Sequence, residues 1–188
     1  RASVPSGAST GAYEAYELRD GEKALSGKSV LKAVDGINTE ISELLCGMEA
    51  SEQEVIDNRM IELDSTKNKS RLGANAILGV SLALSRAQAN SEGKPLYEHL
   101  SSSDSYILPV PMMNLINGGA HSNNSLFIQE FMIMPISAET FNQAIVTGSE
   151  IFHSLKNLLE NDGFSTNVGD EGGVAPDLNT SDEAISYL

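Results

Sequence analysis

The sequence predicts an α/β protein, and three patterns lead to this fold class. Two apolar runs, at residues 109–116 and 127–134, have the length and continuity of strands that are buried on both faces. Over residues 141–159, apolar side chains recur every three or four positions, which predicts one long amphipathic helix. Strands followed by helices indicate an α/β layout, which in barrels carries its chemistry on the loops after the strands.

The first half of the chain is predicted to be mainly helical. Residues 1–4 and 13–18 are candidates for short strands, bounded by Pro5 and by Asp20-Gly21. A helical apolar face runs through residues 29–45, and the letters SEQE at 51–54 predict a capping box that opens a second helix to about residue 63. Residues 73–90 are apolar on nearly all sides, which predicts a helix enclosed within a domain.

A polar break at residues 101–104 is the best candidate for a domain boundary, which gives domains at 1–103 and 104–188. The letters TSDE at 180–183 predict a second capping box and a last helix. The sequence opens at Arg1 without a methionine and ends within that predicted helix. We therefore expect it to be a piece of a longer protein.

Composition narrows the function classes. With 188 residues, 40% of them hydrophobic, the chain can form one or two cores. The net charge of −14 argues against nonspecific binding to nucleic acid or to anionic membranes. The single cysteine, Cys46, excludes an internal disulfide and fits a reducing compartment such as the cytoplasm. No apolar run reaches about 18 residues, so no membrane span is expected.

Two stretches place acidic side chains where chemistry is plausible. The letters GDEGG at 169–173 put Asp170 and Glu171 on a glycine-rich loop, which is the site of a general acid, a solvated turn or a loop that binds cations weakly. The EF-hand spacing is absent. Glu130 lies inside an apolar run, which indicates either strand-end chemistry or a structural ion pair. If this run is a strand, the adjacent Gln129 points to its opposite face.

A histidine and a second small-residue loop complete the set of candidates. His121 follows a Gly-Gly turn after a predicted strand, a position that suits either a substrate contact or an ordinary surface histidine. The loop from Ser6 to Gly11 lacks the lysine and spacing of a nucleotide P-loop. It is either a mobile lid whose hydroxyls ligate a hard metal or a plain flexible turn.

Taken together, five stretches carry a specific resemblance. They are SVPSGASTG at 3–11, GANAILGVS at 73–81, NGGAH at 117–121, QEFM at 129–132 and GDEGG at 169–173. In this order they closely resemble the enolase family, whose enzymes interconvert 2-phosphoglycerate and phosphoenolpyruvate with the help of two Mg²⁺ ions. The resemblance covers the whole sequence and implies an incomplete α+β N-terminal capping domain, followed by the first part of an α/β barrel.

The resemblance also implies roles for individual residues. Glu171 resembles the general acid, Glu130 its carboxylate neighbour, and His121 the histidine that closes over the substrate. Gln129 resembles a residue that contacts the substrate. In the lid loop, formed by Ser6, Gly7, Ala8, Ser9 and Thr10, the serine at position 9 resembles the ligand of the second Mg²⁺. The family's lysine base, its ligands for the first Mg²⁺ and its phosphate-binding residues would all lie beyond residue 188.

Two local departures from the family pattern leave these matched positions untouched. The letters SNNSLF at 122–127 differ from the acidic versions of bacterial relatives, and Lys67 stands where an acidic residue is common. The resemblance further implies a homodimer and a cytoplasmic location, with a cell-surface or secreted form as the alternative. The 188 residues alone are expected to be inactive and poorly soluble. Two alternative functions are a non-catalytic adhesion or plasminogen-binding role and an acid-sugar dehydratase of the same superfamily.

Overall fold

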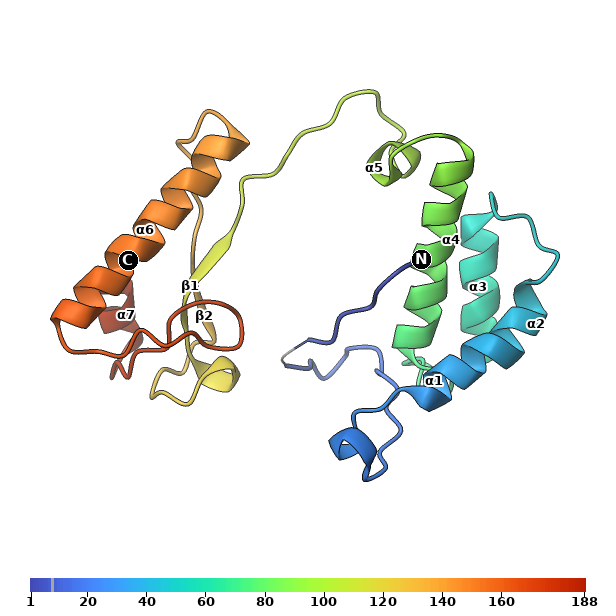
Figure 1. Cartoon of the computed structure of the whole chain (residues 1–188), viewed down its shortest axis with the longest axis horizontal. Coiled ribbons are helices and arrows are strands. Elements are labelled where there is room, and N and C mark those ends of the chain that lie inside the picture. Colours follow the sequence, from blue (N-terminus) through green and yellow to red (C-terminus); the bar gives the residue numbers. More distant parts are fainter. Residues whose placement is uncertain (8) are drawn as a thin grey trace. The chain divides into compact units, whose positions relative to one another are not determined.

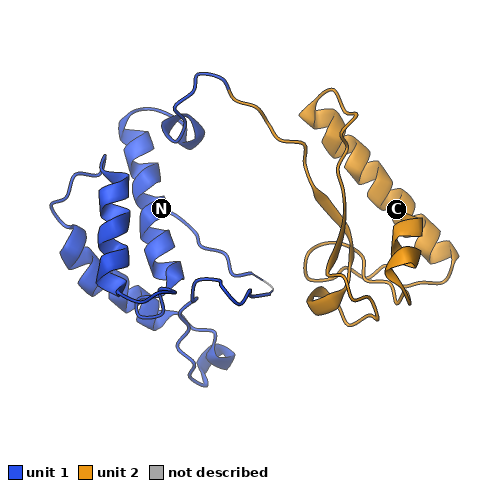
Figure 2. Ribbon diagram, turned by 180° about the vertical axis from the view of Figure 1, so that it is seen from behind, with its two compact units in different colours: residues 1–105 blue, residues 106–188 orange. Residues whose placement is uncertain are grey.

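The chain forms two compact units, Arg1–Ser105 and Tyr106–Leu188. Figure 2 colours them separately. This computed structural model describes residues 1–7 and 9–188. The boundary expected from the sequence, between residues 103 and 104, falls in the same polar stretch as this division.

The first unit is mainly helical, as the sequence predicts. Its principal helices are α1 (Leu31–Gly36), η2 (Ile37–Ile41), α2 (Ser42–Leu45), α3 (Gln53–Asp64), α4 (Ala74–Ser91) and α5 (Leu96–His99), with a short turn η1 (Ala24–Gly27) before them. The helix predicted at residues 29–45 is confirmed as the continuous run from α1 to α2, which contains the π-helical segment η2. The capping box predicted for α3 is wrong. A turn closed by Glu52 N–H and Glu49 O (3.1 Å) makes Glu52 the N-cap residue, with no side-chain cap.

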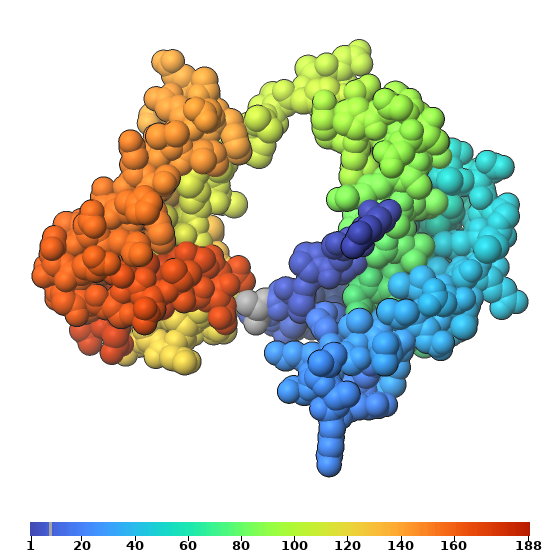
Figure 3. Space-filling model, viewed as in Figure 1, coloured from blue at the N-terminus to red at the C-terminus, as the bar shows by residue number. Residues whose placement is uncertain are grey.

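The core of the first unit lies where α3, α4 and the α1–α2 run pack together. Its buried members are Ala33, Ile41, Ile56, Met60, Leu72, Ala76 and Ile77. The expectation that α4 is enclosed on nearly all sides is wrong, because Leu78 is 46% exposed. That face of α4 borders a groove of about 390 Å³, which Val4 and Pro5 also line. Figure 3 shows the first residues, in dark blue, lying across α4, in green.

The two short strands predicted near the start of the chain are wrong, since neither stretch forms a strand. Residues 13–18 bond to a loop and to the start of α4. Tyr16 N–H donates to Asn68 O (2.7 Å), and Tyr16 O accepts from Ala74 N–H (2.8 Å). The amide of Asn75 pairs with both the N–H and the C=O of Leu18, at 3.0 and 3.1 Å. Because these partners satisfy the backbone, the segment needs no neighbouring strand.

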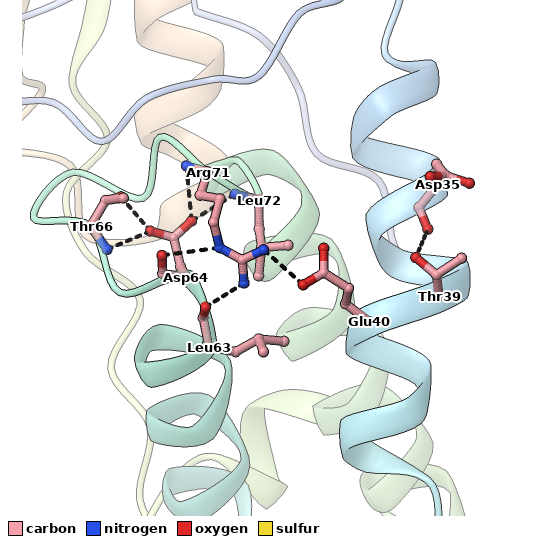
Figure 4. A network of polar contacts seen from close by, with 8 residues as sticks. All are labelled: Asp35, Thr39, Glu40, Leu63, Asp64, Thr66, Arg71 and Leu72. Atoms are coloured by element: carbon pink, nitrogen blue, oxygen red, sulfur yellow. Dashed lines mark hydrogen bonds and ion pairs between the residues drawn. The ribbon is translucent and has the colours of Figure 1, made fainter.

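A buried carboxylate organises the loop between α3 and α4. Asp64, the last residue of α3, is fully buried, and its carboxylate accepts hydrogen bonds from Thr66, Arg71 and Leu72. Figure 4 shows Arg71 reaching from the same loop to Glu40 of the η2 segment. The loop residues are thus tied to the end of α3 on one side and to the preceding helical run on the other.

The second unit contains a two-stranded antiparallel sheet. It is formed by β1 (Met113–Asn117) and β2 (Glu130–Ile133), with Asn117 opposite Glu130 and one extra residue in β1 between Asn114 and Ile116. Strand β1 is shorter than the apolar run around it, because Pro109 and Pro111 have no N–H to donate. The expectation that both faces are buried is wrong for β2, whose Met132 is 47% exposed, because only one face of this sheet meets the core.

Helices α6 (Phe141–Asn161) and α7 (Ser181–Tyr187) confirm the two helices predicted in the second half. Figure 1 shows α6 running beside the sheet. The core joins both strands, both helices and the segment between the helices, through Leu115, Ile116, Leu126, Phe131, Leu155, Leu159, Val174, Leu178 and Ala184. The predicted cap of α7 is confirmed, since Thr180 Oγ1 accepts from Glu183 N–H at 3.1 Å. Among the described residues, no helix has the length and apolar character needed to cross a membrane.

Candidate active site

His121 lies in a tight turn directly after β1. The turn contains the short helix η3 (Gly119–His121), and the imidazole is only 4% exposed. Packing requires a glycine at position 118, just before η3, because a Cβ at Gly118 would lie 2.3 Å from Ile128 O. The turn therefore presses against the segment that leads into β2. Of the two interpretations drawn from the sequence, the surface histidine is wrong.

Glu130, the first residue of β2, lies beside this histidine. The distance between His121 Nδ1 and Glu130 Oε1 is 3.4 Å, and the carboxylate is 32% exposed. The antiparallel register places Glu130 at the end of β1, where the histidine turn begins. The carboxylate and the imidazole form an ion pair when the ring is protonated. The structure thus supplies a partner for the carboxylate that the sequence places in an apolar run.

Gln129 lies immediately before β2 and is exposed. Its backbone oxygen accepts from Gly118 N–H at 2.8 Å, and its Cγ lies 2.8 Å from where a Cβ of Gly119 would be. Its side chain is thus next to the histidine turn and open to solvent, which leaves it accessible to a ligand.

The acidic loop at residues 169–173 is closed on itself and attached to β1. Gly169 N–H donates to Gly173 O at 2.8 Å, and Gly172 has a φ of +85°, which favours glycine. Val174, just after the loop, exchanges two 2.8 Å backbone hydrogen bonds with β1, one with Leu115 and one with Asn117. The loop therefore begins and ends beside the strand that leads into the histidine turn.

Within this unit the structure brings the histidine turn and the acidic loop to neighbouring positions. Asp170 N–H donates to His121 O at 3.2 Å, which joins the acidic loop to the histidine turn. A hollow of about 250 Å³ lies between them, lined by His121, Ser122, Gly169 and Asp170 among others. Glu171 is exposed on the loop, and its backbone oxygen accepts from Asn114 Nδ2 at 3.5 Å.

The candidate lid loop belongs to the first unit, so it is described apart from the other candidates. Ser6, Gly7, Ser9 and Thr10 are all exposed, and Ala8 lies outside the described residues. Both ends of the loop are attached to the segment that follows it. Ser6 Oγ donates to Glu17 Oε2 at 3.0 Å, and Gly11 N–H donates to Glu14 Oε2 at 2.9 Å.

Sequence reasoning missed the asparagines around these loops. Asn117 is fully buried at the end of β1. Asn124 donates to Asn117 O and to Pro176 O, both at 2.8 Å, and so ties the histidine turn to the segment after the acidic loop. The available signal was the presence of two amide side chains, Asn114 and Asn117, in an otherwise apolar run.

Comparison with protein families identifies both halves of the chain. Residues 1–100 match the family described as enolase, N-terminal domain, and residues 105–188 match the family described as enolase, C-terminal TIM barrel domain. The chain belongs to the enolase family. The two matches also support the predicted fold class, in which a mixed helical and strand domain is followed by the first part of an enolase barrel. The family places this protein among the lyases of the enolase superfamily.

Enolase-family domains generally bind Mg²⁺. In residues 1–7 and 9–188, no three acidic, histidine or cysteine side chains gather as a metal site would require. Ser9 lies on an exposed loop, and its hydroxyl and carbonyl oxygens are of the kind that a hard cation binds, but one residue does not complete a metal site. The described residues therefore do not make an Mg²⁺ site by themselves, and the roles considered below are those of the protein's own side chains.

Proposed function

We propose that this chain carries part of the active site of an enolase that interconverts 2-phosphoglycerate and phosphoenolpyruvate. The observation that carries the proposal is the attachment of the acidic loop to the His121–Glu130 pair through Asp170 N–H. His121 and Asp170 line a small hollow, while Glu130 and Glu171 lie on the adjoining strand and loop, and this set of residues suits acid-assisted loss of a hydroxyl group from a small anion. The family membership supports the same class of reaction.

In the proposed reaction, Glu171 is the general acid. Loss of the C2 proton of 2-phosphoglycerate generates an enolate, and the C3–O bond then breaks as the Glu171 carboxyl delivers its proton to the departing hydroxyl, which leaves as water. Glu130 is the proposed carboxylate neighbour of this acid, and the exposed position of Glu171 leaves it accessible to substrate.

The other candidates are proposed to bind and enclose the substrate. His121, which lies beside Glu130, would close over it, and Gln129 would contact it from the adjoining edge. The lid loop of residues 6–10 would exclude water, with Ser9 as a ligand of the second Mg²⁺. When bound, Mg²⁺ supplies positive charge that neutralises the substrate carboxylate and stabilises the enolate. The proton-accepting base and the remaining metal ligands are proposed to lie beyond residue 188, so we expect the 188 residues alone to be inactive.

The test uses the complete gene product that contains this sequence. Formation of phosphoenolpyruvate from 2-phosphoglycerate would be followed by ultraviolet absorbance, with Mg²⁺ present and with Mg²⁺ removed by a chelator. The Glu171→Gln variant is expected to lower kcat about 10²- to 10⁴-fold while the protein stays folded, because an amide cannot donate the proton. Glu150→Gln, at an exposed position on α6, is the matched control and should keep full activity.

Wild-type turnover by Glu171→Gln would remove Glu171 from the mechanism. Absence of the reaction in the unmodified complete protein would refute the proposed substrate. Activity on sugar acids in its place would favour an acid-sugar dehydratase. A homodimeric assembly and a cytoplasmic location are also proposed, and size-exclusion chromatography with light scattering and cell fractionation test them directly.

A further inference from the structure

The acidic loop encloses a side chain that the proposed chemistry does not use. Asn117 ends β1 and is fully buried, and its amide group fills the space between the first and last residues of the loop. A Cβ at Gly169 would lie 2.5 Å from Asn117 Nδ2, and one at Gly173 would lie 2.5 Å from Asn117 Oδ1. Any larger residue at either glycine would collide with this amide, and also with backbone, since the added Cβ would lie 2.9 Å from His121 O at Gly169 and 2.9 Å from Leu115 O at Gly173.

Backbone and side-chain contacts connect Asn117 to the acidic loop and to the segment after the histidine turn. Asn117 N–H donates to Val174 O at 2.8 Å, immediately after the acidic loop. Asn117 O accepts from Ser122 Oγ (3.3 Å) and from Asn124 Nδ2 (2.8 Å), both just after the histidine turn. Asn114 Nδ2 donates to Asn117 Oδ1 and also to Glu171 O. A chain of two amides therefore leads from the buried strand end to the backbone of the proposed acid.

The two amides, Asn114 and Asn117, each bury one polar atom that makes no hydrogen bond within the described residues. Within residues 1–7 and 9–188, Asn117 Nδ2 and Asn114 Oδ1 are buried and accept or donate no hydrogen bond. Buried polar groups left in this condition are costly and rare, and they gather where function requires a specific geometry. An apolar side chain would avoid that cost but could not accept the hydrogen bond from Asn114.

We propose that Asn117 is a positioning residue, which sets the conformation of the acidic loop and so the location of the Glu171 carboxyl relative to His121. The effect of Asn117 on the loop is inferred from the packing alone. Its effect on catalysis rests on the proposed function. Asn117 is fully buried, and it acts through Gly169, Gly173 and Asn114.

The first test measures the loop itself, by hydrogen exchange in the complete gene product. Asn117→Ala removes the amide, and we expect exchange in the peptide that spans residues 166–173 to become at least about tenfold faster. Exchange in α6 should stay at the wild-type rate. If the alanine variant does not fold, Asn117→Ser replaces it, because serine keeps a polar group and is also too short to reach between the two glycines. Asn179→Ala, the same change at an exposed position, is the matched control.

The proposal is overturned if loop exchange stays at the wild-type rate in the variant that folds. It is equally overturned if the loop and α6 lose protection together, since that result describes a general loss of stability. Selective loosening of the loop supports the proposal, whether or not the protein has the proposed activity.

The second test measures catalysis and separates this inference from the proposed function. Displacing an acid by about 1 Å can cost on the order of 100-fold in rate. We therefore expect kcat of Asn117→Ala to fall about 10- to 100-fold, with KM changed by less than about threefold because the substrate contacts remain. A purely structural role would lower the amount of active enzyme without changing kcat per folded molecule. An active wild type with an unchanged kcat in this variant would refute the positioning role, whereas an inactive wild type would refute the proposed function.

Discussion

Removal of the Asp64 carboxylate should destabilise the first unit more than any exposed substitution. The carboxylate is fully buried and accepts hydrogen bonds from Thr66 N–H (3.0 Å), Arg71 N–H (3.1 Å) and Leu72 N–H (2.7 Å). The hydroxyl of Thr66 donates a further one. These bonds hold the loop that connects α3 with α4, so their loss affects the packing of both helices.

The size of the effect of Asp64→Ala follows from these contacts. An unsatisfied buried N–H costs about 1–3 kcal/mol. Leu72 is 3% exposed, so water reaches its N–H poorly and we assign it about 2 kcal/mol. The N–H groups of Thr66 and Arg71 can turn toward water, which reduces their cost to about 1 kcal/mol each. We expect the free energy of unfolding to fall by about 3–5 kcal/mol, a large part of the stability of a small domain. Asp64→Asn keeps one acceptor oxygen and should lose roughly half as much.

Urea unfolding of the complete gene product that contains this sequence, followed by far-ultraviolet circular dichroism, measures this change. The control is Glu62→Ala, which removes an exposed carboxylate from α3 that lies 3.9 Å from Arg59. It should change the free energy of unfolding by no more than about 0.5 kcal/mol. A loss below about 1 kcal/mol for Asp64→Ala would refute the reasoning.

The same carboxylate makes the stability of the first unit sensitive to acid. Burial raises the pKa of Asp64, but the hydrogen bonds from Leu72, Thr66 and Arg71 outweigh it and hold the pKa below the ordinary value of 3.8. A lowered pKa in the folded state means that the stabilisation is fully present above the ordinary value. It is lost as the pH falls through the lower, folded value. Asp64→Asn should therefore reduce the dependence of the urea midpoint on pH in this acidic range.

Two further predictions concern the second unit. Hydrogen bonding of the Tyr187 hydroxyl to Asp162 raises the pKa of Tyr187 to about 12, so this contribution to stability is present below the ordinary value of 10.0 and lost as the pH rises through about 12. In Asp162→Asn, one tyrosine should ionise at lower pH in an ultraviolet absorbance titration, and an unchanged titration curve would contradict this. Gly118→Ala should lower the free energy of unfolding by about 2–3 kcal/mol, because its Cβ meets the backbone oxygen of Ile128. Gly148→Ala meets only the flexible end of Met113 and gains helix propensity, so it should cost about 1 kcal/mol or less, and equal thermal shifts for the two variants would refute the comparison.

Local patterns in the sequence were sufficient to predict most of the helices. The periodic apolar face of residues 141–159 corresponds to α6, and the Thr180 cap forms as expected because both depend on contacts within one or two helical turns. Local patterns failed for residues 1–4 and 13–18. Whether an extended segment becomes a strand depends on which backbone lies beside it, and for residues 13–18 that partner is a loop and the start of α4.

The sequence by itself determined the family, the fold class and the residue types available for catalysis, because these follow from motifs whose order and spacing can be read along the chain. Only the tertiary structure decided that His121 is buried beside Glu130, that Asp170 joins their turn to the acidic loop, and that the amide of Asn117 fits between Gly169 and Gly173. These contacts join residues up to 56 positions apart, from Asn117 to Gly173. Their geometry depends on the packing of β1 against the segment around Val174, which no local pattern specifies.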